Sequence, residues 1–227
     1  MIELIQFPWS PFCLVQRRIL EYSGAKFKIT NVPPNDRTLV WKLTRQRYYG
    51  VPIIKDGKMV VFETNEFSQV IAKYIDAKYQ LGLFPKPWQG VDRMVWRNIE
   101  DQVEGCAFRL NDVYFEEFVP KKEQLAYLRH KERKWGAACV EQWRHQQAAL
   151  VTQLTENLVP YELMLANRPY LLRDEPHFVD FDLWGMLANF LYSGHNQLPA
   201  AHVRLNDWYG RMSKATKNGL TSEKLHP

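Results

Sequence analysis

The sequence has few cysteines and lacks any long hydrophobic run. Its three cysteines, at positions 13, 106 and 139, show neither Cys-x-x-Cys nor metal-ligand spacing. This pattern argues against a disulfide framework and favours a reducing compartment, so we expect a cytoplasmic protein. No run of about 18 apolar residues occurs, and the N-terminus, with Glu3, has no apolar stretch of signal-peptide length. We therefore expect no membrane-spanning segment and no membrane partner.

A dense block of basic residues is also lacking. The chain has 30 basic and 25 acidic residues in 227, a net charge of +5. This small excess is compatible with an anionic ligand, but it is weak evidence for nucleic acid, which we do not expect as a partner. The length fits one large domain or two modest ones. There is neither an internal repeat nor a low-complexity segment.

The most informative stretch is the junction at residues 7–13. Residues 2–7 alternate well enough to predict a strand, and a helical pattern follows the junction. Pro11 suits the first helical position and Ser10 the N-cap. A strand–turn–helix junction of this kind stabilises an anion through backbone N–H groups and the positive end of the helix dipole. A hydroxyl at that place can donate to a thiolate.

The next segments predict a small α/β domain over residues 1–80. Residues 26–31 alternate as a second strand, which favours a parallel βαβ unit, and residues 37–47 form a weak helical pattern. Residues 50–62 read as two strands joined by an Asp-Gly turn, with Pro52 at the start of the first, where it could be cis. A helix then opens at residues 63–66 with Thr64 as its N-cap and Glu66 in its first turn. The order βαβαββα is that of a thioredoxin-like domain.

The rest of the chain predicts helices only. Residues 81–90 form a linker that contains two prolines and two glycines. Residues 91–227 then read as an all-α helical-bundle domain. Its predicted helices cover residues 91–118, residues 121–135, and residues 137–166 with an interruption at Pro160.

Three short motifs carry a family resemblance. The turn from Ser10 to Cys13 resembles the active-site turn of the glutaredoxin and glutathione transferase families. Val51-Pro52 looks like the Val-Pro element of the thioredoxin-like superfamily, and Glu63-Thr64 looks like the Glu-Ser pair of the transferases. In this order, the motifs resemble a glutathione S-transferase with a Ser-type, omega-like site.

The resemblance implies glutathione as co-substrate, no metal, a homodimer and a role in detoxification. It implies Ser10 as the catalytic residue that stabilises the thiolate. The glutathione-binding residues it implies are Pro11, Phe12, Val51, Pro52, Glu63 and Thr64. Residues 45–50 depart from the family pattern before Val-Pro, so the group that holds the glycyl carboxylate is open, with Arg37 and Lys42 as candidates.

A marker in the second half supports the resemblance. Residues 170–187 look like the transferase segment that contains a buried capping aspartate, here Asp180, with His177 in place of Ser or Thr at the cap. A metal site on Asp180 and Asp182 is the alternative, which we discount because no further ligands have suitable spacing.

Several chemistries remain open at the predicted site. Ser10 favours conjugation of the glutathione sulfur to an apolar electrophile, with Trp9 and Phe108 as possible walls of the acceptor pocket. Cys13 would instead form a mixed disulfide and support thiol transfer or deglutathionylation. Ether cleavage and dehalogenation also suit a serine site. The third hypothesis is a binding or scaffold protein that has the transferase fold but catalyses no reaction.

Overall fold

The alternating residues at the N-terminus form strand β1 (Ile2–Gln6), followed by helix α1 (Pro11–Tyr22) and strand β2 (Phe27–Asn31). These elements come from a computed structural model, which describes residues 1–65 and 68–219. β1 and β2 pair in parallel, so the predicted βαβ unit is confirmed. Ser10 is the N-cap residue of α1 and proline follows it in the first turn, as predicted.

The Asp-Gly turn joins strands β3 (Ile53–Asp56) and β4 (Met59–Val61), which pair antiparallel as predicted. Gly57 has φ +59°, a conformation that glycine adopts at little cost. The sheet order is β2-β1-β3-β4, and the peptide bond between Val51 and Pro52 is cis. Helix α2 (Thr38–Leu43) is shorter than predicted. It ends before two residues with positive φ, Arg45 and Gln46.

The predicted start of the next helix is wrong. Helix α3 (Val70–Tyr79) begins six residues after Thr64, so Thr64 is not its N-cap. The carboxylate of Glu63 instead accepts hydrogen bonds from the N–H groups of Val70 at 2.8 Å and Ile71 at 3.1 Å. A carboxylate at a helix start satisfies unpaired donors and suits the helix dipole. The predicted first-turn position of Glu66 lies outside the described residues.

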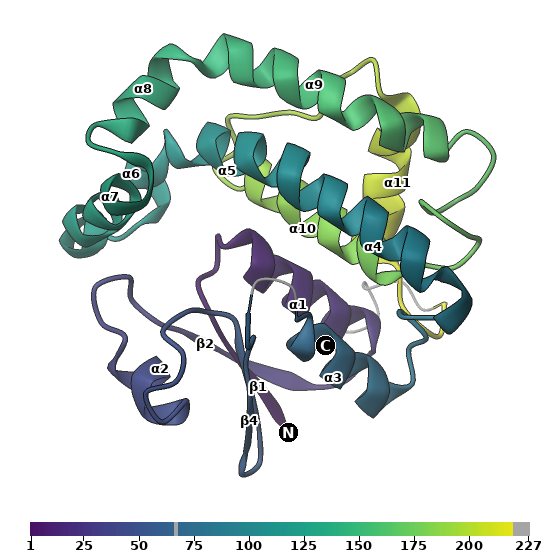
Figure 1. The fold of residues 1–227 in the computed structure, drawn as a ribbon, viewed down its shortest axis with the longest axis horizontal. Helices are drawn as coiled ribbons and strands as arrows, with labels where there is room; N and C mark the ends of the chain where they lie inside the picture. The colour runs from purple at the N-terminus through teal and green to yellow at the C-terminus, as the bar shows by residue number, and fades with distance from the viewer. Residues whose placement is uncertain (66–67, 220–227) are drawn as a thin grey trace.

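Helices make up all the regular structure that is described after α3, and they cover one side of the α/β part (Figure 1). They are η1 (Lys86–Trp88), α4 (Gln89–Asn98), the π-helix η2 (Ile99–Glu104), α5 (Gly105–Asp112), α6 (Phe115–Phe118), α7 (Lys121–Trp135), α8 (Cys139–His145), α9 (Gln147–Met164), α10 (Phe178–Phe190) and α11 (Val203–Lys214). The predicted bounds of α7 are confirmed.

Two details of the helical prediction are wrong. The pattern over residues 91–118 is divided among four elements, with a π-helical segment in the middle. Pro160 lies inside α9, and the break falls earlier, at Gln146. A proline removes one hydrogen bond and can bend a helix without ending it. Here Leu158 and Tyr161, on either side of Pro160, are both buried in the core and hold the helix in place.

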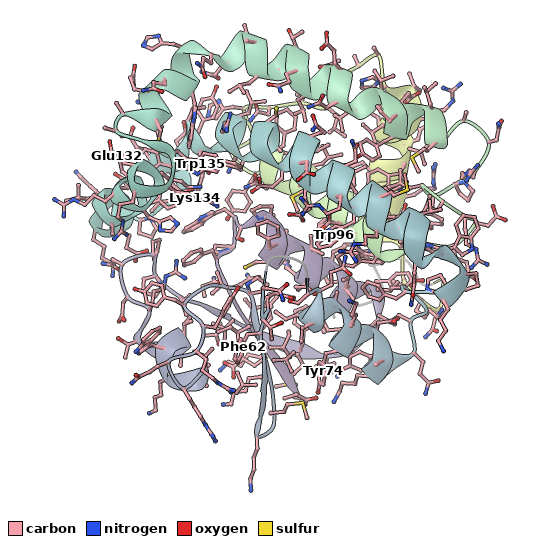
Figure 2. All side chains as sticks on the ribbon, viewed as in Figure 1. Phe62, Tyr74, Trp96, Glu132, Lys134 and Trp135 are labelled. Carbon is pink, nitrogen blue, oxygen red and sulfur yellow. The ribbon has the colours of Figure 1, made fainter. Side chains whose placement is uncertain are left out.

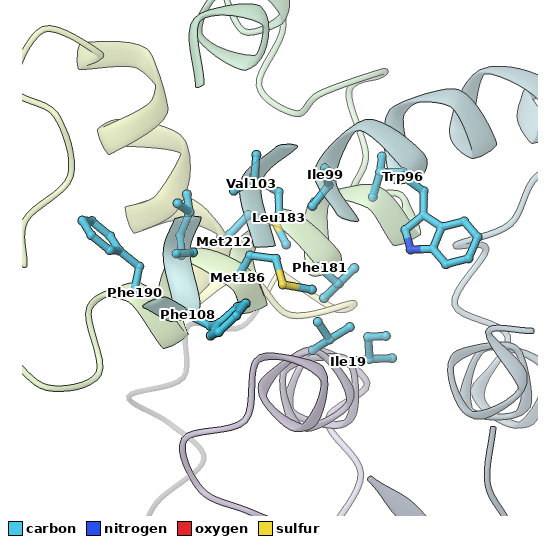
Figure 3. Close-up of a cluster of buried hydrophobic side chains, with 14 of the residues drawn as sticks. Ile19, Trp96, Ile99, Val103, Phe108, Phe181, Leu183, Met186, Phe190 and Met212 are labelled. Carbon is cyan, nitrogen blue, oxygen red and sulfur yellow. The ribbon is translucent and has the colours of Figure 1, made fainter. Parts of the chain in front are cut away.

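The helical part packs against α1 mainly through α10. A Cβ atom on Gly185 would lie 2.3 Å from Val15 Cγ2 and 3.0 Å from the Pro11 carbonyl oxygen. Glycine therefore allows α10 to approach the first turns of α1 closely. Figure 3 shows the apolar core beside this contact, where Ile19 of α1 lies near Phe181 and Met186 of α10.

A buried arginine fixes the C-terminal end of α11 to α1. The Arg18 side chain donates from Nε to the Met212 carbonyl at 2.6 Å, and its guanidinium also donates to the Ala215 carbonyl. The last carbonyls of a helix lack partners within the helix, and a cation is favourable at that end. The cation therefore completes the end of α11 while it joins two segments nearly 200 residues apart.

The predicted capping aspartate is confirmed. Asp180 is fully buried at the start of α10 and accepts hydrogen bonds from the His177 N–H, the Leu171 N–H and the Trp208 indole, each at 2.9 Å. Burial raises the pKa of Asp180 to about 6. The His177 ring instead lies 3.1 Å from Asp92. Asp180 thus ties the start of α10 to its preceding loop and to α11.

Candidate active site

A cleft of about 400 Å³ lies between the β1–α1 turn and helices α5 and α7. Its lining brings together several residues that are far apart in the sequence. Of the predicted site residues, it contains Trp9, Ser10, Pro11, Phe12, Val51 and Phe108. The N-terminal and helical parts of the chain therefore each supply one wall of the cleft.

The turn that carries Ser10 is fixed from both sides. The Ser10 N–H donates to the Phe7 carbonyl at 3.3 Å, and the Asn189 amide of α10 donates to the Trp9 carbonyl at 2.7 Å. The Ser10 hydroxyl makes no capping hydrogen bond to α1. The first N–H groups of the helix and the hydroxyl thus lie at the same wall of the cleft, an arrangement that suits an anion.

Cys13 lies behind Ser10 and does not line the cleft. Its side chain has no exposed surface. Burial raises the pKa of the Cys13 thiol to about 12, although hydrogen bonds with the Ser10 hydroxyl and the Phe7 backbone oppose this shift. The thiol is therefore protonated at neutral pH and is shielded from a ligand in the cleft.

Besides Cys13, four predicted residues are not brought to the cleft, namely Pro52, Glu63, Thr64 and Lys42. Pro52 is buried behind Val51. Glu63 is engaged at the start of α3, where it also accepts a hydrogen bond from the Ser68 hydroxyl at 2.5 Å. The Thr64 N–H donates to the same hydroxyl at 3.2 Å. Their roles toward glutathione stay predictions.

Arg37 is the candidate cation that the structure does bring to the cleft. Its guanidinium carbon lies 4.2 Å from the centre of the Phe7 ring, and Nη1 donates to the Tyr49 carbonyl at 3.3 Å. Asp36 accepts from the Thr38 N–H at the start of α2 and so fixes the backbone beside Arg37. Burial lowers the pKa of Arg37. The half-buried guanidinium remains a cation on the N-terminal wall.

Aromatic side chains fill the inner part of the cleft. Trp9 is 6% exposed and stacks on Phe7 at 5.4 Å between ring centres. Phe118 and Tyr127 of the helical part cover it, with ring centres 5.5 and 6.1 Å away. Phe108 contacts Trp135 at 5.4 Å. The cleft therefore has an apolar interior to which both parts of the chain contribute.

The sequence analysis missed the polar side of the helical wall. The residues concerned are Glu104, Asp112, His130, Lys131 and Lys134, together with Tyr127 and the Trp135 ring. Lys134 and Trp135 are labelled in Figure 2. Residues 104, 108 and 112 recur every four positions, and residues 127, 131 and 134 lie on one face of α7. This spacing shows from the sequence that each set of residues shares one helix face. It does not show that these two faces line the cleft.

This wall carries one ion pair and three ionisable groups, Glu104, His130 and Lys134, whose side chains have no hydrogen bond or ion pair within residues 1–65 and 68–219. Asp112 accepts from the Tyr127 hydroxyl at 2.7 Å and forms an ion pair with Lys131. Burial lowers the pKa of His130, and so do the nearby cations Lys131, Arg37, Arg133 and Lys134. Burial raises the pKa of Glu104. The cleft can therefore hold an anionic ligand and also presents a carboxyl group.

Within residues 1–65 and 68–219, no group of three or more His, Cys, Asp or Glu side chains could hold a metal ion. Over the same residues, the helices are too short or too polar to cross a membrane.

Comparison with known proteins identifies a family for the N-terminal part and a fold for the whole chain. Residues 4–83 match the family model described as glutathione S-transferase, N-terminal domain. The search of curated proteins returned no match. The fold of the whole chain is that of the glutathione transferases, an α/β part followed by a helical part.

Two solved structures illustrate the likeness. A glutathione transferase (GSTFuA3) of Phanerochaete chrysosporium has a TM-score of 0.80 at 18% identity, with 93% of this chain and 95% of that chain covered. Glutaredoxin 2 of Salmonella typhimurium, in complex with glutathione, has a TM-score of 0.74 at 18% identity, with coverage of 100% and 99%. At these identities, the likeness establishes the fold.

Proposed function

We propose that this chain is a glutathione transferase that binds glutathione in the cleft and attacks an apolar electrophile with its sulfur. The observation that carries the proposal is the position of Ser10. It is the N-cap residue of α1, its hydroxyl makes no capping bond, and it lines the cleft. The family match over residues 4–83 supports glutathione as the ligand.

The chemistry at Ser10 follows from the charge of the sulfur. A free thiol has a pKa near 8.5 and is a weak nucleophile until it loses its proton. The Ser10 hydroxyl and the N–H groups at the start of α1 would stabilise the thiolate and lower that pKa. Arg37 adds a positive charge on the same wall. Its guanidinium is also our candidate for the glycyl carboxylate of glutathione.

The remaining glutathione contacts are proposed with different degrees of support. Pro11, Phe12 and Val51 line the cleft, where the backbone of a peptide ligand would meet them. Pro52 would act by fixing Val51. Glu63 and Thr64 would need to face the γ-glutamyl end, although their polar groups are engaged in the loop before α3. A homodimer and a cytoplasmic location stay expectations from the resemblance.

The aromatic interior supports an apolar acceptor. Trp9 and Phe108 come from the two walls, and the electrophile would lie against the rings between them. In the conjugation, the thiolate forms a bond to an electrophilic carbon. Thiol transfer by Cys13 is the weaker alternative, because that thiol is fully buried and its pKa is raised to about 12.

Difference absorbance of glutathione thiolate against pH, with and without the protein, tests the proposal. Thiolate that appears well below pH 8.5 supports an activating serine site. Binding without thiolate would point to Cys13 chemistry or to a non-catalytic role. Absence of binding would overturn the proposal and favour a scaffold.

A further inference from the structure

Two carboxyl groups, Glu104 and Asp112, line the cleft. Of these two, only the Glu104 carboxyl group has neither a hydrogen-bond partner nor an ion-pair partner within the described part of the chain. It lies at the end of η2, and neither a hydrogen bond nor an ion pair holds its side chain within residues 1–65 and 68–219. Asp112, on the same face two turns later, accepts a hydrogen bond from Tyr127 and forms an ion pair with Lys131. The two acids therefore differ: Asp112 has a structural role, and Glu104 is available to a ligand.

The position of Glu104 is suited to proton transfer. It shares the cleft with Ser10 and lies one helical turn before the aromatic ring of Phe108. It is only partly exposed. The π-helix that ends at Glu104 is a type of segment often found at functional sites. Burial of a carboxyl group that has no hydrogen-bond partner disfavours its charged form and so favours the protonated form.

The charged groups around Glu104 come from four elements. Lys131 and Lys134 of α7 and Arg109 of α5 favour its ionised form, whereas burial and Asp112 oppose ionisation. Glu104 in turn adds to the effect of burial that raises the pKa of Glu100 in the same π-helix and of the fully buried Asp182 in α10. The net effect raises the pKa of Glu104, with burial as the largest cause.

We propose that Glu104 is a catalytic acid and that the acceptor is an aromatic epoxide. This inference rests on the proposed transferase activity. The thiolate sulfur forms a bond to one epoxide carbon, and the C–O bond breaks with its electron pair on oxygen. Glu104 gives its proton to that oxygen, which becomes an alcohol, and the Glu104 carboxylate later regains a proton from water. Acceptors that release a halide ion need no such proton.

The test compares Glu104→Gln with the unchanged protein on two acceptors, styrene oxide and chlorodinitrobenzene. The substitution preserves size but cannot transfer a proton. We expect a loss of about a hundredfold or more in kcat with the epoxide, as is typical for general acids. The rate with the aryl chloride should stay within about twofold. Asp101→Asn, in the same π-helix but exposed and outside the cleft, is the matched control.

The pH profile separates this role from a structural one. With styrene oxide, kcat should rise with pH as thiolate forms and fall as Glu104 loses its proton. Glu104→Gln should remove the fall and keep the rise, and Glu104→Asp should retain part of the fall. An unchanged epoxide rate, or equal losses on both acceptors, would overturn the inference. If instead thiolate never forms in the unchanged protein, the proposed function itself is wrong.

Discussion

The two walls of the cleft differ in how they are built. The N-terminal wall is a short local motif, in which Ser10 and the first turn of α1 present backbone N–H groups and one hydroxyl. The helical wall consists of side chains from α5 and α7, spaced along two helices and directed to the cleft by packing. A binding site made mainly of backbone groups can be predicted from residues that are adjacent in the sequence. A pocket made of side chains from separate helices cannot, because the tertiary structure decides which side chains meet.

Among changes that should affect conjugation of every acceptor, the largest effect is expected at Ser10 on the N-terminal wall. Ser10→Ala removes the hydroxyl that would donate to the thiolate, and a hydrogen bond to a charged group contributes about 1.5–3 kcal/mol. We expect kcat to fall roughly 10- to 100-fold at neutral pH, with glutathione still bound. Steady-state kinetics and the thiolate titration measure both quantities. Ser23→Ala, at the other end of α1, should leave both unchanged.

The packing of α10 on α1, which positions the helical part against the N-terminal wall, can be tested through Gly185. Gly185→Ala places a methyl group against Val15 and the Pro11 carbonyl, so we expect a loss of about 1–3 kcal/mol in the free energy of unfolding. Urea denaturation measures the loss. Gly210→Ala is the control, since no atom lies within 4 Å of its added Cβ and alanine favours α11. Equal stability of the two variants would contradict the close approach of α10 to α1.

A smaller effect, on the affinity for glutathione, should follow the removal of the Arg37 charge from the N-terminal wall. Arg37→Gln leaves a neutral group beside the cleft, and we expect the Kd for glutathione to rise about tenfold, the loss of one moderate charged contact. Calorimetric titration measures the Kd. Lys42→Gln alters the other candidate, which is exposed and outside the cleft. Should Lys42→Gln give the larger effect, the assignment to Arg37 would be reversed.

The smallest effect is expected when the folded protein is treated with a reagent that alkylates thiols, because Cys13 is buried. Because the pKa of this thiol is raised to about 12, it stays protonated below that pH in the folded protein. The protonated form contributes stability that is present below the ordinary thiol pKa near 8.5 and is lost as pH rises toward about 12. Iodoacetamide at pH 7.5 should modify Cys13 only after unfolding, as peptide mass spectrometry would show. Rapid modification of the folded protein would favour thiol transfer instead.

Local chemistry explains what the sequence could predict. The hairpin follows from Asp56-Gly57, and the bounds of α7 follow from Pro120 before it and Gly136 after it. Asp180 was identified through the resemblance of residues 170–187 to a transferase segment, and its hydrogen bond from the His177 N–H, three residues earlier, confirms the cap. The start of α3 was missed because Glu63 bonds to N–H groups seven and eight residues further on.

The parts of the site that escaped prediction depend on distant contacts. Arg37 resembles a solvated helix charge in the sequence, and only its packing on Phe7 brings it to the cleft. Glu104 looks like one acid among several in an amphipathic run. Its lack of a partner becomes visible only when α7 and α10 are in place beside it.

The bond from Arg18 to the end of α11 has a consequence for synthesis on the ribosome. Helix α1 is synthesised long before the carbonyl groups that Arg18 binds, because these belong to Met212 and Ala215, 194 and 197 residues further on. The amide that holds the Trp9 carbonyl, on Asn189, also follows 180 residues later. The turn at Ser10 therefore gains its full support only after α10 and α11 have been synthesised. Nascent chains that stop before α11 should lack an ordered anion site.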